Sequence, residues 1–168
     1  TGTYEGVHAF LASENITGFV PKILIAPGFT HTRTEAVGET PATSNPVVAE
    51  LIGIAERLKA IIVADGPNTN DADAFAYAKD FGSKRVFLVD PKVLKSVEGE
   101  TSQEWASACV AGLIAKSDND RGWWWSPSNQ EINGIVGTAR AIDFAMGDAN
   151  CRANLLNEKN ITTIIRQQ

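Results

Sequence analysis

Short apolar runs alternate with amphipathic stretches along this chain. The runs end at Pro, Gly or Asp and have the continuous aliphatic character of strands that are buried on both faces of a parallel sheet. Between them, apolar residues recur at helical spacing. We expect strands at 22–26, 61–64, 85–89, 123–125 and 161–165. We expect helices at 4–12, 45–58, 70–81, 101–114 and 148–156.

Capping signals support four of these helix starts. A side-chain oxygen at the N-cap satisfies a free backbone amide of the first turn, and Pro is favoured at the first helical position. The signals are Asn45 before Pro46, Asn70, the capping box Thr101 with Glu104, and Asp148. The alternation predicts a single α/β domain over 1–168, with a mainly parallel sheet and helices on both faces. The polar segment 29–44 is expected to form a long loop or a small excursion.

Three adjacent tryptophans, Trp123, Trp124 and Trp125, need a separate explanation. In an extended strand their side chains alternate, so both faces of that strand would have to be apolar. Each ring can bury roughly 150–250 Å², and exposing three of them to water would be costly. Two interpretations stay open at this point. The rings are core residues of this domain, which we favour, or they form a subunit contact, because Trp is enriched at the centres of interfaces.

Composition narrows the classes of partner. The chain has 168 residues, a net charge of −5 and no Lys/Arg cluster, so neither nucleic acid nor an anionic membrane is an expected partner. No apolar run has the length of a membrane span, and no signal peptide is recognisable, so we expect a protein that is not secreted. Cys109 and Cys151 are interpreted as free thiols from a reducing compartment.

The sequence offers little for catalysis, metal binding or cofactor binding. Asp65 and Asp90 follow strands, but Asp before Gly-Pro or Pro is common turn chemistry, which we favour over a catalytic pair. His8 and His31 have no second ligand at metal spacing. A Ser-His-Asp arrangement in the subtilisin order cannot be built, and G-x-S-x-G is absent. The nucleotide-binding signatures G-x-G-x-x-G and G-x-x-x-x-G-K-[ST] are also missing. No catalytic, cofactor or metal residue is therefore predicted.

Six segments, which together span nearly the whole chain, resemble one known family. They are PKILIAPGF (21–29), NPVVAEL (45–51), IIVADGPNT (61–69), RVFLVDP (85–91), VAGLIAKSDNDRGWWWSPSNQEINGIVG (110–137) and GDANCRANLLNEKNITTIIRQ (147–167). The family is the sheath protein of contractile bacteriophage tails, with temperate myophage and R-type bacteriocin sheaths as the nearest types. The SPSNQEINGIVG stretch is the most specific part of the likeness.

The resemblance implies a subtilisin-like α/β fold without the protease active site. It also implies a structural subunit that forms stacked hexameric rings around a tail tube, attached to a baseplate, and contracts to drive the tube through the host envelope. The expected location is the virion tail, assembled in the host bacterial cytoplasm. Besides the three tryptophans, possible interface residues are Asp118, Asp120, Arg121 and Glu131, although a solvated loop is the interpretation that we favour for each of these charges.

Two departures from the family pattern accompany the resemblance. The stretch 30–44 is longer than the usual connection to the Asn-Pro helix, and the apolar run 161–165 ends just before Gln168, where family members continue into a further domain. We therefore expect a fragment of a longer sheath protein.

The alternative to a structural sheath subunit is an α/β hydrolase, or a nucleotide-binding or flavin-binding enzyme, with a site formed by Asp65, Asp90 and Ser126.

Overall fold

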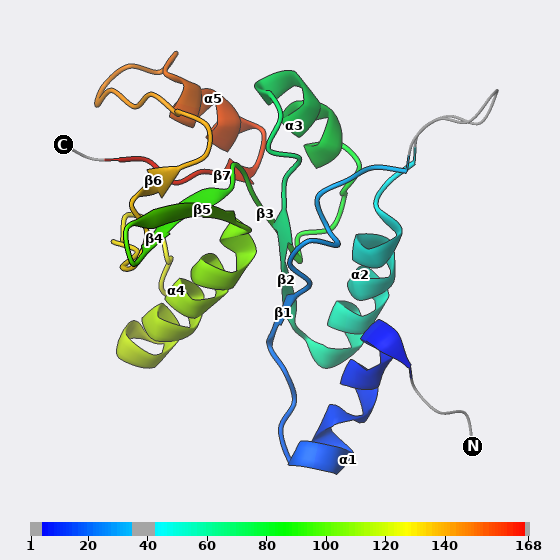
Figure 1. Cartoon of the computed structure of the whole chain (residues 1–168). Helices are drawn as coiled ribbons and strands as arrows, with labels where there is room; N and C mark the ends of the chain where they lie inside the picture. Colours follow the sequence, from blue (N-terminus) through cyan, green and yellow to red (C-terminus); the bar gives the residue numbers. More distant parts are fainter. Residues whose placement is uncertain (1–4, 35–42, 167–168) are drawn as a thin grey trace.

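Four parallel strands form the central sheet of the computed structural model, which describes residues 5–34 and 43–166 (Figure 1). The strands are β1 (Ile23–Ile25), β2 (Ile61–Asp65), β3 (Val86–Val89) and β7 (Ile161–Thr162), in the spatial order β1-β2-β3-β7. Leu24 is paired with Ile62, Ala64 with Leu88, and Leu88 in turn with Ile161. The prediction of a mainly parallel sheet is confirmed.

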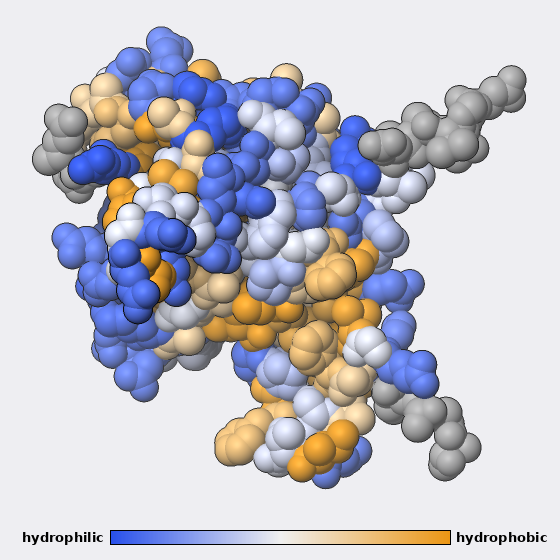
Figure 2. Space-filling model, in the orientation of Figure 1, coloured by the Kyte–Doolittle hydropathy of each residue, from blue (hydrophilic) through white to orange (hydrophobic). Residues whose placement is uncertain are grey.

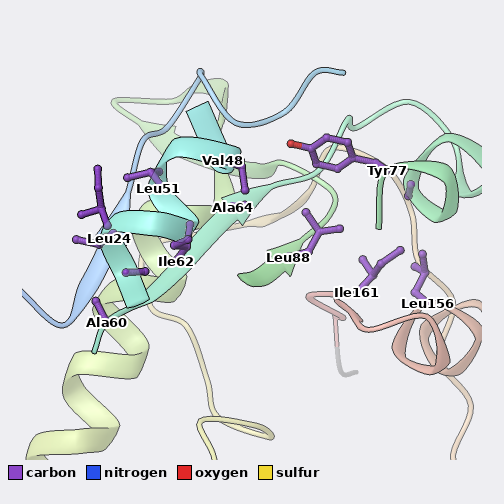
Figure 3. Close-up of a cluster of buried hydrophobic side chains, with 13 residues drawn as sticks. Leu24, Val48, Leu51, Ala60, Ile62, Ala64, Tyr77, Leu88, Leu156 and Ile161 are labelled. Atoms are coloured by element: carbon purple, nitrogen blue, oxygen red, sulfur yellow. The ribbon is translucent and has the colours of Figure 1, made fainter. Parts of the chain in front are cut away.

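Helices cover both faces of this sheet, because alternate strand residues point to opposite sides. On one face, Leu24, Ile62 and Leu88 belong to a buried cluster with residues of α2 (Pro46–Leu58), α3 (Asp71–Ala78) and α5 (Arg152–Glu158), shown in Figure 3. The 3-10 helix η1 (Gly6–Ala12) packs against α2 and leads into α1 (Ser13–Thr17).

The opposite face of the sheet is covered by α4 (Ala106–Arg121). Val63 and Val89 pack there with Ala106, Val110 and Ile114, which are spaced along one side of the helix. In Figure 1, α4 lies on the other side of the strands from α2. The predicted apolar side of this helix is therefore confirmed, although its start was misplaced.

A hairpin occupies the region where the capping box was expected, and that prediction is wrong. Strands β4 (Val93–Val97) and β5 (Glu100–Glu104) pair in antiparallel fashion, and β6 (Gly137–Thr138) adds to the other edge of β4. Glu98 and Gly99 both have positive φ, 52° and 89°, which matches the two-residue hairpin turn that fits the twist of the strands. Thr101 and Glu104 thus face Ser96 and Val93 across a ladder.

Several predicted boundaries also differ from the structure. Helix α3 ends at Ala78, and β7 covers only Ile161–Thr162 of the predicted 161–165. Asp148 does not cap α5, which begins at Arg152. Instead, the Asp148 carboxylate accepts a hydrogen bond from the amide of Asn150 at 2.8 Å. Of the predicted first helix, Tyr4 lies outside the described residues.

The predicted cap at the start of α2 is confirmed, and the Asn45 side chain also binds two carbonyl oxygens of the preceding segment. The side-chain oxygen Oδ1 of Asn45 accepts from the Val48 amide at 3.0 Å. Its amide group donates to the carbonyl oxygens of Phe29 and Thr32 at 2.9 and 2.8 Å, which holds the start of the segment 29–44 against the helix. Thr34 and Thr43 form an antiparallel bridge, and residues 35–42 lie outside the described part. The interpretation of 29–44 as a loop or excursion stays a prediction.

We predict that Asn45→Ala destabilises the chain by about 2–4 kcal/mol. It removes a cap worth about 1 kcal/mol and leaves two carbonyl groups without their donor. The matched control is Asn70→Ala at the start of α3, where the exposed side chain accepts from the Asp73 amide at 2.9 Å. That variant should cost about 1 kcal/mol. Urea unfolding followed by circular dichroism measures both, and equal losses would contradict the additional role of Asn45.

Candidate functional site

In open parallel sheets, ligands bind beyond the carboxyl ends of the strands, where Asp65 is the last residue of β2 and Asp90 follows β3. Both carboxylates are buried. Asp65 accepts hydrogen bonds from the Ser107 amide at 2.8 Å and the Ser107 hydroxyl at 2.7 Å. Ser107 lies in the first turn of α4, whose N-cap residue Trp105 makes no side-chain cap. Asp65 therefore caps α4 from the sheet.

The electrostatics of Asp65 fit this structural role. Burial raises the pKa of Asp65, and the hydrogen bonds from Ser107 and Thr30 oppose that shift. Its backbone amide also donates to the Thr30 hydroxyl at 2.9 Å. Both carboxylate oxygens already have partners within the fold, and the positive end of the α4 dipole lies beside them. This arrangement holds the start of α4 in place.

Asp90 belongs to a cluster of four charged residues with Asp71, Arg140 and Arg152. Arg140 donates to both Asp71 and Asp90, and Arg152 donates to Asp71 at 2.9 and 3.0 Å. The second oxygen of Asp90 accepts from the Asn68 amide at 2.7 Å. The cluster ties the irregular segment 139–151 to the ends of α3 and β3.

The close approach of the two strand ends explains the Asp-Gly-Pro sequence that follows β2. A Cβ on Gly66 would lie 2.6 Å from the Cβ of Asp90, a distance that real Cβ contacts do not reach. The glycine therefore lets the Asp90 carboxylate lie beside the turn. Asp65 and Asp90 serve turns and helix ends, as the sequence interpretation favoured, and not a shared reaction centre.

The remaining groups of the alternative enzyme site do not assemble into a triad. The Ser126 hydroxyl is exposed and donates to the Ser128 hydroxyl at 3.0 Å. The exposed His8 lies 3.6 Å from Glu50, and His31 stacks on Trp105 with ring centres 4.1 Å apart. Within residues 5–34 and 43–166, no hydrogen bond links Ser126 to a histidine or a carboxylate. Serine activation needs such a link to a base.

Neither cysteine has the surroundings of a reactive thiol. Cys109 is half-buried and donates to the Ala106 carbonyl, and burial raises the pKa of this thiol, which disfavours the thiolate. Cys151 is buried at the start of α5. Both are free thiols, as predicted. Across the part of the chain that the structure describes, no three His, Cys, Asp or Glu residues gather as metal ligands.

The strand predicted at 123–125 is wrong, and so is the interpretation of its tryptophans as core. Gly122 ends α4 with a φ of 95°, and the chain then turns, with the Trp125 amide donating to the Gly122 carbonyl at 3.0 Å. Trp123, Trp124 and Trp125 are 80%, 71% and 53% exposed. We call residues 122–125 the tryptophan turn. The rings are exposed because a tight turn gives them no second layer of the chain to pack against.

The charged candidates cluster around the end of α4. Asp120 lies 3.5 Å from Lys116, one helical turn away, and the Arg121 guanidinium lies 5.8 Å from the Trp125 ring. Asp118 is half-buried near the helix end, and Glu131 is exposed in the following loop. These residues share the surface around the tryptophan turn, and their role as an interface stays a prediction.

Comparison with known proteins decides the family. The family model described as the phage tail sheath protein central domain matches residues 2–168. The chain belongs to the phage tail sheath protein family. It is 47% identical over 167 residues to a prophage major tail sheath protein of Pseudomonas aeruginosa, covering 98% of this chain and 40% of that protein. It is 31% identical over 170 residues to the tail sheath protein of Escherichia phage P2, covering 99% and 39%.

Solved structures agree on the sheath fold. The helical sheath of the anti-feeding prophage in its contracted state has a TM-score of 0.62 and 20% identity, and the match covers all of this chain and 42% of that one. A chain of the anti-feeding prophage baseplate has a TM-score of 0.54 and 24% identity, covering 70% and 28%. The more specific expectation of a subtilisin-like arrangement stays a prediction.

Sheath family membership helps to decide between the structural and the enzymatic interpretation of Asp65 and Asp90. Tail sheath proteins are structural, so the family supports the non-enzymatic interpretation. The chain spans about 40% of the length of the sheath relatives it matches. None of the helices within the described ranges has the length and apolarity that crossing a bilayer requires.

We predict that Asp71→Asn is less stable than the wild type, and that this loss of stability is larger at pH 7 than at pH 3. Hydrogen bonds from Arg152 and Arg140 hold the pKa of Asp71 below its ordinary value of 3.8. A carboxyl with a lowered folded-state pKa stabilises the fold above the unfolded-state pKa, and this contribution is lost as pH falls through the folded-state pKa. Urea midpoints at pH 7 and pH 3 should show the gap between the two proteins shrinking. A gap of equal size would contradict the role of the ion cluster.

Proposed function

We propose that this chain is the central domain of a contractile tail sheath subunit. The complete subunit polymerises into stacked hexameric rings around a tail tube, and the sheath contracts to drive the tube through the host envelope. The observation that carries the proposal is the family match over nearly the whole chain. A relative named as a prophage major tail sheath protein, 47% identical, and the fold likeness to a contracted helical sheath give further support.

The proposed partners follow from the same comparisons. The first is further copies of the chain, because the neighbour with a TM-score of 0.62 is a helical sheath. The second is a baseplate, since a fold match comes from a baseplate structure. The tail tube is the third. Nucleic acid and membrane are not proposed as partners, because the net charge is −5 and the sequence has no basic cluster. The location is the virion tail, assembled in the host bacterial cytoplasm.

Within this function, residues 1–168 act as one domain of a longer sheath protein. The chain spans about 40% of its relatives' length, which supports that division. The domain is well suited to move as one body, because α4 is tied to the sheet through Asp65 and the 139–151 segment is tied to α3 and β3 by ion pairs. A body of this kind can change its contacts with neighbours while its own fold is unchanged.

We predict that the complete protein carrying this domain forms rings or tubes visible by negative-stain electron microscopy. The 168-residue chain alone should run as a monomer or weak dimer in analytical ultracentrifugation. The reason is that the connections between copies are proposed to reside largely outside this domain. Tubes formed by the isolated chain would contradict this division of roles, and a complete protein that never assembles would contradict the sheath function.

The enzyme alternative is tested separately with activity probes. A fluorophosphonate probe for serine hydrolases should leave Ser126 unlabelled, because its hydroxyl contacts Ser128 and no base. ATP, NAD and FMN should leave the melting temperature of the chain unchanged in a thermal-shift screen. Labelling at Ser126, or a clear rise in melting temperature with one nucleotide, would favour the α/β hydrolase or nucleotide-binding reading instead.

A further inference from the structure

The tryptophan turn presents three large rings that the described part of the chain leaves exposed. Its three rings are 80%, 71% and 53% exposed, which amounts to roughly 300–500 Å² for rings of about 150–250 Å² each. An exposed apolar patch of this size is comparable to the largest patch on a typical monomer, and such patches are often functional. A second exposed pair, Ile16 and Phe19, lies around the end of α1. Figure 2 shows orange surface in its lower part, where Figure 1 places α1.

The turn holds its rings in a defined arrangement. Gly122 has a φ of 95°, and a Cβ at this position would lie 2.5 Å from the ring of Trp124, so the ring packs directly on the glycine backbone. Trp123 and Trp124 meet edge to face with centroids 6.0 Å apart. Because the rings are already positioned, a partner that covers them does not have to order them first.

A cavity of about 480 Å³ lies at the other end of α4. Its volume is in the range of sites that receive compact, mostly apolar groups. The lining includes Pro27, Val93, Trp105, Ala108, Cys109 and Ile135. The Trp105 ring is held from outside the cavity by stacking with His31 at 4.1 Å and by the Lys92 ammonium at 3.8 Å. We call this the α4 cavity.

The two features cannot meet within one chain. They are separated by the length of α4, about 20 Å from Ala108 to Arg121 at 1.5 Å per residue. Their flanking charges are complementary. Arg121 beside the turn makes no ion pair with any described residue, and neither does Glu104 at the edge of the cavity. Lys95 also lies at that edge, within reach of an approaching acidic group such as Asp120.

We propose that the tryptophan turn of one copy of this chain inserts into the α4 cavity of a second copy, with Arg121 approaching Glu104. This inference rests on the proposed sheath function. Rings and helical stacks are built from heterologous contacts, in which one surface of a subunit meets a different surface of the next. The turn and the cavity supply two such surfaces at opposite ends of one helix, and that helix is fixed on β1 and β2.

The size of the contact suits a subunit that exchanges neighbours. The turn offers roughly 300–500 Å², against about 800 Å² per partner in a stable standard interface. The contact is therefore too small to hold two isolated chains together. In an assembly with further connections it adds to their strength and sets the direction in which copies follow one another.

The first test uses the complete protein with Trp123→Ala and Trp124→Ala combined. We expect the critical concentration for assembly, measured by sedimentation, to rise by about tenfold or more, as for tryptophans at interface centres. The melting temperature of the unassembled protein should stay unchanged, because the rings are exposed. The matched control is Phe19→Ala, an aromatic ring with 78% exposure near α1, which should assemble as the wild type does.

The second test identifies the occupant of the cavity. Trp124→Cys is combined with Ala108→Cys, an exposed position in the lining of the cavity, in a protein that also carries Cys109→Ala, and assembled protein is treated with a short bismaleimide. We expect cross-links between copies that carry different tags, and their loss when Ala108 is left unchanged. Cross-links confined to one chain, or directed to a segment outside this domain, would overturn the inference.

The outcomes separate the inference from the function on which it rests. If the wild-type complete protein forms neither rings nor tubes, the sheath function fails. If it forms them and the double tryptophan variant assembles equally well, only the contact between the tryptophan turn and the α4 cavity is wrong. An equal loss in the Phe19→Ala control would also overturn the contact, because the effect would not be specific to the turn.

Discussion

The buried carboxylate of Asp65 is the interaction on which the arrangement of this domain depends. It ends the central strand β2 and accepts both the amide and the hydroxyl of Ser107, so the start of α4 is held at the carboxyl edge of the sheet. Burying a charge is costly unless its oxygens are hydrogen bonded, and here they are. Because α4 also packs on β1 and β2, the whole helix has a fixed place on the sheet. The tryptophan turn and the α4 cavity therefore keep fixed positions relative to the sheet, separated by the length of the helix.

Much of the fold could be predicted from local sequence signals. The runs that became β1, β2 and β3 are short, apolar and followed by turn residues, and Asn45 and Asn70 cap the helices that they were expected to cap. These features depend on residues close in sequence, where backbone preference and side-chain hydrogen bonding act together. The hairpin of β4 and β5 was not predicted, because its strand residues are mostly polar and because Thr101 with Glu104 also fits a capping box. Only the backbone of Glu98 and Gly99 distinguishes the two.

The candidate site was less accessible to sequence reasoning for two physical reasons. Arg140 and Arg152 reach Asp71 over 69 and 81 residues, and Arg140 reaches Asp90 over 50, so no local spacing announces the ion cluster. The prediction that the three tryptophans are core residues failed for a different reason. The prediction of a core cluster considered only contacts inside one chain, and the rings are exposed there. The centre of an interface is also depleted of charge and enriched in aromatic residues, so composition alone does not separate it from a core.

The contacts that Asn45 makes with the residues before it allow the length of the 29–44 segment to vary. Asn45 binds the carbonyl oxygens of Phe29 and Thr32, and Thr34 bridges to Thr43, so the two ends of the excursion meet at a fixed base beside α2. Sequence inserted or deleted between those ends leaves the strand and helix on either side in register. A change in the length of the sequence between Thr34 and Thr43 therefore leaves β1 and α2 joined through the same base, and the sheet keeps its register.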